Sequence, residues 1–191
     1  LDEAKQKGTG KWVSQNALDL GSPIPTINAS VESRIISAYK AERVTASSLL
    51  VGPDLKISGK TSILVDTVRD ALYAAKICSY SQGFSLLRLA SKEYGYNLNY
   101  AEIARIWHGG CIIRAQFLND VTVAFKRTPD LVNLMLDKEF SKIMNTHQIA
   151  LRKLVMLAAE SGIPTLAFYS ALAYYDAYRS SRLPANLTQA Q

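Results

Sequence analysis

The sequence predicts an all-α protein, a single large helical domain around a long central helix, with a duplicated helical unit. No segment alternates apolar and polar residues with the two-residue period of a strand, whereas apolar residues recur at helical spacing along most of the chain. Glycine and proline turns divide this pattern into segments of helix length. A hydrophobic content of 48% with 20% charged residues is typical of a globular core.

The stretch 62–96 predicts the central helix, which at about 1.5 Å per residue would reach about 50 Å. Its first third is amphipathic, with one apolar stripe formed by Val65, Val68, Leu72 and Ala75. The following stretch, 77–87, carries no charge and has apolar side chains all round the helix, which predicts burial. Gly83 inside this helix is expected to mark the close approach of a neighbouring helix.

Two helices and a loop are expected before the central helix. A first helix over 10–20, capped by Thr9, ends at a turn with glycine and proline. A second helix over 26–50 begins at Pro25, because proline is favoured in the first turn of a helix. A loop over 54–60 then leads to the central helix.

Asn99 and Asp137 are expected to cap the helices that follow them, because their side chains accept hydrogen bonds from free N–H groups. The segments expected after the central helix are helices over 100–107 and 111–126, a short irregular or helical stretch over 128–136, a helix from Asp137 to about residue 160, a helix over 165–180 and a last turn after Pro184.

A short repeat predicts the duplicated unit. Ile-Pro-Thr occurs at 24–26 and at 163–165, and the offset of 139 residues also aligns Ala38-Tyr39-Lys40 with Ala177-Tyr178-Arg179. Two related helical units would produce this pattern. Chance matching between alanine-rich helices is the alternative.

Charge and composition exclude several classes of protein. The net charge of +6 suits acidic partners such as phosphorylated small molecules, but no run of basic residues indicates nucleic-acid binding. Cys78 and Cys111 are expected to be free thiols in a reducing compartment, and with His108 and His147 they form no metal-ligand spacing. No apolar run has the length of a membrane span. Since the chain opens at Leu1, we expect a piece of a longer protein.

The run Lys7–Trp12 has the parts of an anion site. Its two glycines permit a tight turn, and the start of a helix offers free N–H groups with partial positive charge. Thr9 adds a hydroxyl, and Lys7 and Lys11 add charge. Arg34 on the next helix could reach the same anion with two hydrogen bonds. From the residues alone, a helix start with solvated lysines and an arginine paired with an acid remain the alternatives.

Several motifs, in order along the whole chain, resemble the large helical domain of decarboxylating 6-phosphogluconate dehydrogenases. They are Lys7–Trp12, Arg43-Val44, Ala46-Ser47, Gly52-Pro53, Tyr80–Phe84, Gly109–Arg114, Gly162–Pro164, Tyr174–Asp176 and Leu183–Asn186. His108 departs from the family, where a basic residue, often arginine, precedes the glycine pair.

The resemblance implies a homodimer that oxidatively decarboxylates 6-phosphogluconate to ribulose 5-phosphate and CO2 in the pentose phosphate pathway, with NADP and without a metal, in the cytoplasm or a plastid. It assigns the substrate phosphate to Lys7, Thr9 and Arg34. The family's general base and acid, its dinucleotide-binding domain and its C-terminal tail lie outside this chain. No catalytic residue is therefore assigned here, and we expect the isolated chain to be inactive.

Two other functions remain open at this stage. A non-catalytic helical module that acts only through dimerisation would not need the Lys7–Trp12 motif or Arg34. A nucleic-acid binder is supported only by net charge, and retention of DNA or RNA at low salt would distinguish it.

Overall fold

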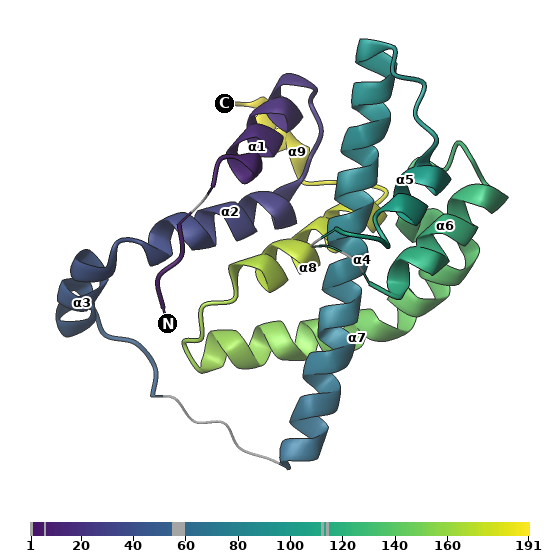
Figure 1. Cartoon of the computed structure of the whole chain (residues 1–191). Coiled ribbons are helices and arrows are strands. Elements are labelled where there is room, and N and C mark those ends of the chain that lie inside the picture. The colour runs from purple at the N-terminus through teal and green to yellow at the C-terminus, as the bar shows by residue number, and fades with distance from the viewer. Residues whose placement is uncertain (1, 6, 55–59, 112, 114) are drawn as a thin grey trace.

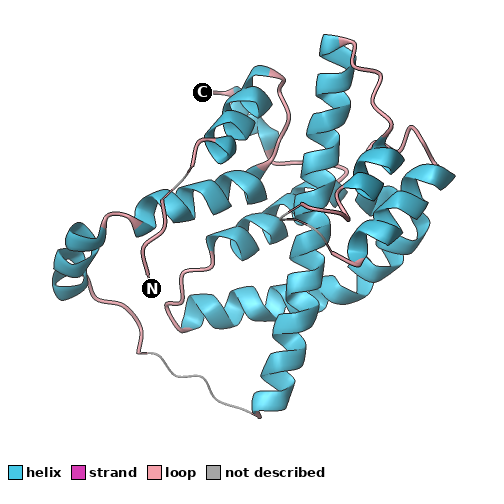
Figure 2. Ribbon diagram, viewed as in Figure 1, coloured by secondary structure: helices cyan, strands magenta, loops and turns pink. Residues whose placement is uncertain are grey.

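Helix α4 (Thr61–Tyr94) runs the full height of the molecule in the computed structural model, which describes residues 2–5, 7–54, 60–111, 113 and 115–191 (Figure 1). The described residues form helices and loops only, so the all-α prediction is confirmed (Figure 2). The predicted central helix is also confirmed. It ends at Gly95, whose positive φ of 67° glycine adopts without strain.

All buried residues of α4 follow residue 70, and the hydrophobic core lies against this part of the helix. Helices α7 (Lys138–Glu160) and α8 (Leu166–Arg179) pack on this part of α4, and α5 (Tyr100–Ile106) packs on α6 (Phe117–Arg127). A short 3₁₀ turn, η1 (Leu134–Leu136), also contacts α4. Ile77, Cys78 and Phe84 are buried, as the uncharged stretch predicts.

The predicted apolar stripe on the first third of α4 is largely exposed in the single chain. Val65, Val68 and Leu72 are 59%, 38% and 56% exposed, whereas Ala75, nearer the core, is 8% exposed. Helical periodicity marks an apolar face but does not say what covers it.

Local capping signals predicted two helix starts correctly. The Asn99 side chain accepts a hydrogen bond from the Glu102 N–H at 3.1 Å at the start of α5. Asp137 accepts from the N–H groups of Glu139 and Phe140 at 2.9 and 3.3 Å at the start of α7. Both caps act within three residues, which is why the sequence indicates them.

The expected helix over 26–50 is wrong, because it is two helices, α2 (Pro25–Ser37) and α3 (Lys40–Leu49). The break leaves the Ser37 carbonyl free to accept a hydrogen bond from the Arg43 guanidinium at 3.0 Å. No local signal marks this break, since the compensating contact comes from a side chain six residues later. Of the loop expected over 54–60, residues 55–59 lie outside the described residues.

The expected helix over 111–126 is also wrong in its first part, because α6 begins at Phe117. The Ile113 carbonyl accepts a hydrogen bond from the Tyr80 hydroxyl of α4 at 2.8 Å. This tertiary contact satisfies the carbonyl outside a helix. Positions 112 and 114 lie outside the described residues. Cys111 is half-buried, and both cysteines are free.

The turns that join α1 (Thr9–Asp19) to α2 and α7 to α8 have the same geometry, but the turn after α4 at Gly95 shares it, so the duplicated unit stays a prediction. Gly21 and Gly162 both have φ 64°, and the next helix begins four residues later, at Pro25 and at Leu166. The residue after each glycine donates an N–H to a carbonyl five residues earlier, at 2.8 Å in both turns. These two turns align with an offset of 141 residues rather than the 139 of the sequence repeat, because Pro164 precedes its helix whereas Pro25 starts one.

Gln82 fixes the place where α2 meets α4. Its side-chain oxygen accepts from the Thr26 N–H at 2.9 Å, and its amide donates to the Thr26 hydroxyl at 2.8 Å. Both residues are buried. From this anchor α2 runs beside α8, with which it also packs (Figure 1). The helix that carries Arg34 thus starts from a fixed point on the core.

Two further findings concern α4 and the last residues. A Cβ on Gly83 would meet nothing within 4 Å, so the expected close approach of a helix is wrong.

The last helix of this chain is the short α9 (Ala185–Gln189). Among the described helices, none combines the length and the apolar character that a membrane crossing requires.

Candidate anion-binding site

Helix α1 begins at Thr9 without a side-chain cap, so the predicted Thr9 cap is wrong. Gly8 occupies the cap position with φ 101°, a conformation that glycine adopts far more readily than other residues, and its carbonyl accepts the Trp12 N–H at 2.9 Å. Thr9 is instead the first helical residue and is exposed. The first turn of α1 therefore presents free N–H groups beside the Thr9 hydroxyl, which is an arrangement that favours anions.

The start of α1 lies directly against α2. A Cβ on Gly10 would come within 2.8 Å of Cγ2 of Val31, so only glycine permits this approach without a shift. Val31 and Arg34 are three residues apart on α2 and share one face of the helix. The contact therefore brings the Thr9 turn close to the helical turn that carries Arg34.

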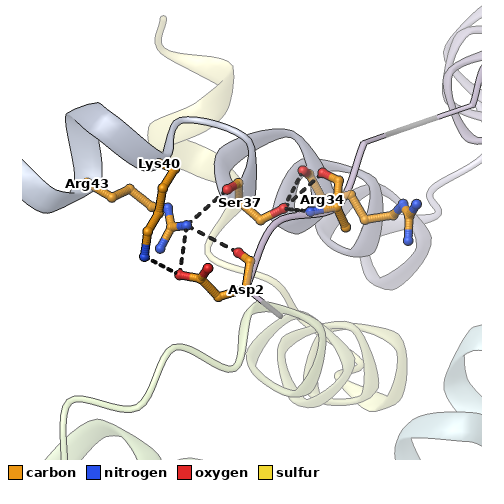
Figure 3. Close-up of polar contacts among 6 residues, drawn as sticks. Asp2, Arg34, Ser37, Lys40 and Arg43 are labelled. Atoms are coloured by element: carbon orange, nitrogen blue, oxygen red, sulfur yellow. Dashed lines mark hydrogen bonds and ion pairs between the residues drawn. The ribbon is translucent and has the colours of Figure 1, made fainter.

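Arg34 is exposed, and its Nη2 donates a hydrogen bond to the Lys5 carbonyl. Its side chain extends away from the group formed by Asp2, Lys40 and Arg43 (Figure 3). An arginine has five N–H donors, so the bond to Lys5 leaves others for an anion. The paired-acid alternative does not hold for this arginine, since its hydrogen bond goes to a backbone carbonyl.

The structure places Gly10 against Val31 and the Lys5 carbonyl against Arg34, so Lys7 and Thr9 lie in the chain between two points that contact α2, at the corner where the N-terminal segment, α1 and α2 meet. The Lys7 side chain is exposed. The three assigned residues therefore come from two helices and the segment that precedes them. Their joint contact with one phosphate stays a prediction.

Sequence reasoning missed a second group of residues at this corner. Asp2 forms ion pairs with Lys40 at 2.7 Å and with Arg43 at 3.3 Å, and Ser37 bonds to the backbone of Ala4. The hydrogen bonds from Lys40 and Arg43 lower the pKa of Asp2. A sequence feature that could have pointed to this group is the position of Ser37 one helical turn after Arg34, on the same side of α2.

The described cysteine and histidine side chains lie elsewhere or are inert. Burial raises the pKa of Cys78 to about 12, so this core thiol stays protonated and is no nucleophile. One ring nitrogen of His147, Nδ1, lies 3.0 Å from the Ile143 carbonyl in its own helix. His108 follows α5 and holds its Nε2 buried without a partner.

Comparisons with known proteins identify the family of the chain. The family model for the C-terminal domain of 6-phosphogluconate dehydrogenase matches residues 1–191. The chain is 55% identical to the NADP(+)-dependent, decarboxylating 6-phosphogluconate dehydrogenase of Bacillus subtilis, over all of this chain and 41% of that protein. It is 54% identical to the decarboxylating 6-phosphogluconate dehydrogenase of Salmonella typhimurium, again over all of this chain and 41% of that protein.

A solved structure also matches along the entire chain. The 6-phosphogluconate dehydrogenase of Plasmodium falciparum, described in apo form and in complexes with its cofactor NADP+ and its substrate 6-phosphogluconate, superposes with a TM-score of 0.94 at 42% identity. This chain covers 41% of that chain. It therefore spans about two fifths of the length of its relatives, and it belongs to the family of 6-phosphogluconate dehydrogenase C-terminal domains.

Proposed function

We propose that this chain is the C-terminal helical domain of an NADP-dependent enzyme that oxidatively decarboxylates 6-phosphogluconate to ribulose 5-phosphate and CO2. Its own task is to hold the substrate phosphate with Lys7, Thr9 and Arg34 and to form the homodimer. NADP and the groups that move protons belong to the rest of the enzyme, including a dinucleotide-binding domain. The names of the relatives support this role, and so does the length that the chain shares with them.

The corner between α1 and α2 is the observation that carries this proposal. Lys7 and Arg34 each bring a positive charge, and the uncapped start of α1 adds N–H groups and the Thr9 hydroxyl. A phosphate dianion accepts several charge-assisted hydrogen bonds at once. Holding it there would fix one end of the sugar acid, so that its other end meets the catalytic groups in one orientation.

Replacement of the two cations tests the proposal. In the full-length enzyme, Lys7→Ala and Arg34→Ala should each raise KM for 6-phosphogluconate about tenfold to hundredfold, because each removes a charge-assisted hydrogen bond of about 1.5–3 kcal/mol. KM for NADP should stay within twofold. Lys153→Ala, which removes one exposed charge from α7, is the matched control and should leave both values unchanged.

Steady-state kinetics on the purified variants give the answer. An unchanged KM in both variants would remove Lys7 and Arg34 from the site. The isolated chain, assayed beside the full-length enzyme, should show no turnover. If the full-length protein also fails to oxidise 6-phosphogluconate, the enzymatic proposal is wrong.

A non-catalytic dimerisation module remains the second candidate, since the exposed apolar stripe on α4 is what dimerisation would use. The two proposals share this surface and differ in turnover. For the enzyme we propose the cytoplasm or a plastid, and the two free cysteines are consistent with a reducing compartment.

A further inference from the structure

The segment Asp2–Lys5 is tied to α2 and α3 by side chains rather than by packing alone. The Ser37 hydroxyl oxygen accepts the Ala4 N–H at 2.8 Å, and its proton lies within reach of the carbonyls of Ala4, at 2.9 Å, and Arg34, at 2.8 Å (Figure 3). A hydroxyl has one proton to donate, so one of these two carbonyls receives it at a time. The Ala4 N–H is held in either case.

A second tie lies one turn further along the chain. Nη2 of Arg43 donates to the Asp2 carbonyl at 3.1 Å and to the Ser37 carbonyl at 3.0 Å. Lys40 adds its ion pair to the Asp2 carboxylate at 2.7 Å. These contacts join the segment to the end of α2 and the start of α3.

The contacts on α2 repeat every three residues. Val31 receives Gly10, Arg34 donates to the Lys5 carbonyl, and Ser37 holds Ala4. Residues 31 and 34, and residues 34 and 37, are neighbours on the helix surface, so the three form a slanted stripe whose ends are about 9 Å apart along the axis. Ala4 and Gly10 are thus both fixed to this stripe, with Arg34 between the anchors.

This arrangement restricts Lys7, which lies midway between the anchored residues Ala4 and Gly10. Six residues could span about 20 Å when extended, so the Ser37 anchor, together with the bond from Arg34 to the Lys5 carbonyl, limits how far Lys7 can lie from Arg34. With both anchors in place its backbone stays near the turn of α2 that carries Arg34. A flexible lysine binds one phosphate jointly with an arginine only if the two are held close together.

We propose that Ser37 is a positioning residue that sets the distance between Lys7 and Arg34 for the substrate phosphate. This inference rests on the proposed function and deepens it. Ser37 does not itself touch the anion. It acts through the backbone of Ala4, whereas Val31 provides the second fixed point through Gly10.

Removal of the hydroxyl tests the inference in the full-length enzyme. Ser37→Ala should raise KM for 6-phosphogluconate about tenfold and change kcat less than about twofold, because the anchor acts in binding and not in chemistry. Ser37→Thr keeps the hydroxyl and should restore KM. Ser33→Ala is the matched control, since the Ser33 hydroxyl bonds to the Ala29 carbonyl within α2 at 2.7 Å.

A double-mutant cycle distinguishes positioning from general loosening of α2. In the Lys7→Ala background, Ser37→Ala should change KM less than about twofold, since the lysine that it positions is gone. An equal rise in both backgrounds, or an equal rise in Ser33→Ala, would overturn the inference. So would an unchanged KM in Ser37→Ala while Lys7→Ala raises it. If Lys7→Ala and Arg34→Ala leave KM unchanged, the phosphate site itself fails, and this inference fails with it.

Discussion

Asp137 joins two helices through one buried carboxylate. It caps α7 through the N–H groups of Glu139 and Phe140, and it forms an ion pair with Arg127 at the end of α6. Its side chain is only 2% exposed. Burial alone would raise its pKa, but the hydrogen bonds from Arg127, Phe140 and Glu139 outweigh that effect and lower it. The ionised carboxylate is therefore the form that stabilises the fold.

The lowered pKa predicts a loss of stability in acid. A group whose pKa is lower in the folded protein stabilises it above the unfolded pKa of about 4 and loses that effect as the pH falls through the folded value. The free energy of unfolding, measured with urea, should fall between about pH 5 and pH 3. Asp137→Asn keeps a cap acceptor but has no charge, so this slope should become shallower.

Other carboxylates also contribute to the dependence of the free energy of unfolding on pH. The hydrogen bond from Arg152 also lowers the pKa of Asp176, so Asp137→Asn should reduce the slope without abolishing it. Asp137→Ala loses the cap as well and should cost about 0.5–2 kcal/mol more than Asp137→Asn at neutral pH. An identical slope in wild type and Asp137→Asn would show that this carboxylate does not control the acid transition.

At the scale of the elements, two glycines have opposite roles. Gly10 allows α1 to touch α2 at Val31, whereas a Cβ on Gly83 of α4 would meet no atom within 4 Å. Valine is stiff in a helix and cannot easily turn its methyl groups away. Substitution of alanine should therefore lower the stability of the protein at Gly10 and raise it at Gly83.

Gly83→Ala should stabilise the protein by about 0.5–1 kcal/mol, because glycine lowers the stability of a helix interior. Gly10→Ala should destabilise it and, in the full-length enzyme, raise KM for 6-phosphogluconate by moving the Thr9 turn away from α2. The double variant Gly10→Ala/Val31→Ala should recover both the stability and the KM, because Val31→Ala leaves only a Cβ, which lies 3.8 Å from the added Cβ and does not clash with it. Urea unfolding and kinetics measure these effects. No recovery in the double variant would contradict the proposed contact.

At the scale of the whole molecule, the exposed apolar side chains of α4 indicate an interface with a partner. Val65, Val68 and Leu72 form one stripe on α4 and are 59%, 38% and 56% exposed, and α3 buries none of its residues. Contiguous apolar surface of this kind marks an interface more often than a solvated face. A second copy of the enzyme is the partner that the proposed function requires.

Leu72→Asp in the full-length enzyme should shift the sedimentation coefficient from that of a dimer towards that of a monomer, because a buried, unpaired carboxylate opposes association. Far-ultraviolet circular dichroism should stay unchanged, since Leu72 is exposed in the single chain. Val123→Asp on α6, which is 55% exposed, is the matched control and should remain dimeric. A dimer of unchanged stability in Leu72→Asp would exclude this face from the interface.

The sequence alone determined what depends on neighbouring residues. The span of α4, the caps at Asn99 and Asp137 and the turn at Gly162 follow from side chains within a few positions of each other. The run Lys7–Trp12 has the parts of an anion site, because glycines and cations stand near a helix start. Its assignment, with Arg34, to the substrate phosphate came from the family resemblance and stays a prediction.

Only the tertiary structure decided the rest. The Arg43 side chain bonds both to the carbonyl at the break after Ser37 and to Asp2, and the late start of α6 is accompanied by the Tyr80 bond, so both involve contacts between distant segments. The exposure of Val65 depends on which elements pack on α4. The bond between Ser37 and Ala4 joins residues 33 positions apart. Such contacts have no local periodicity or propensity, because they arise only when the folded core brings two segments of the chain together.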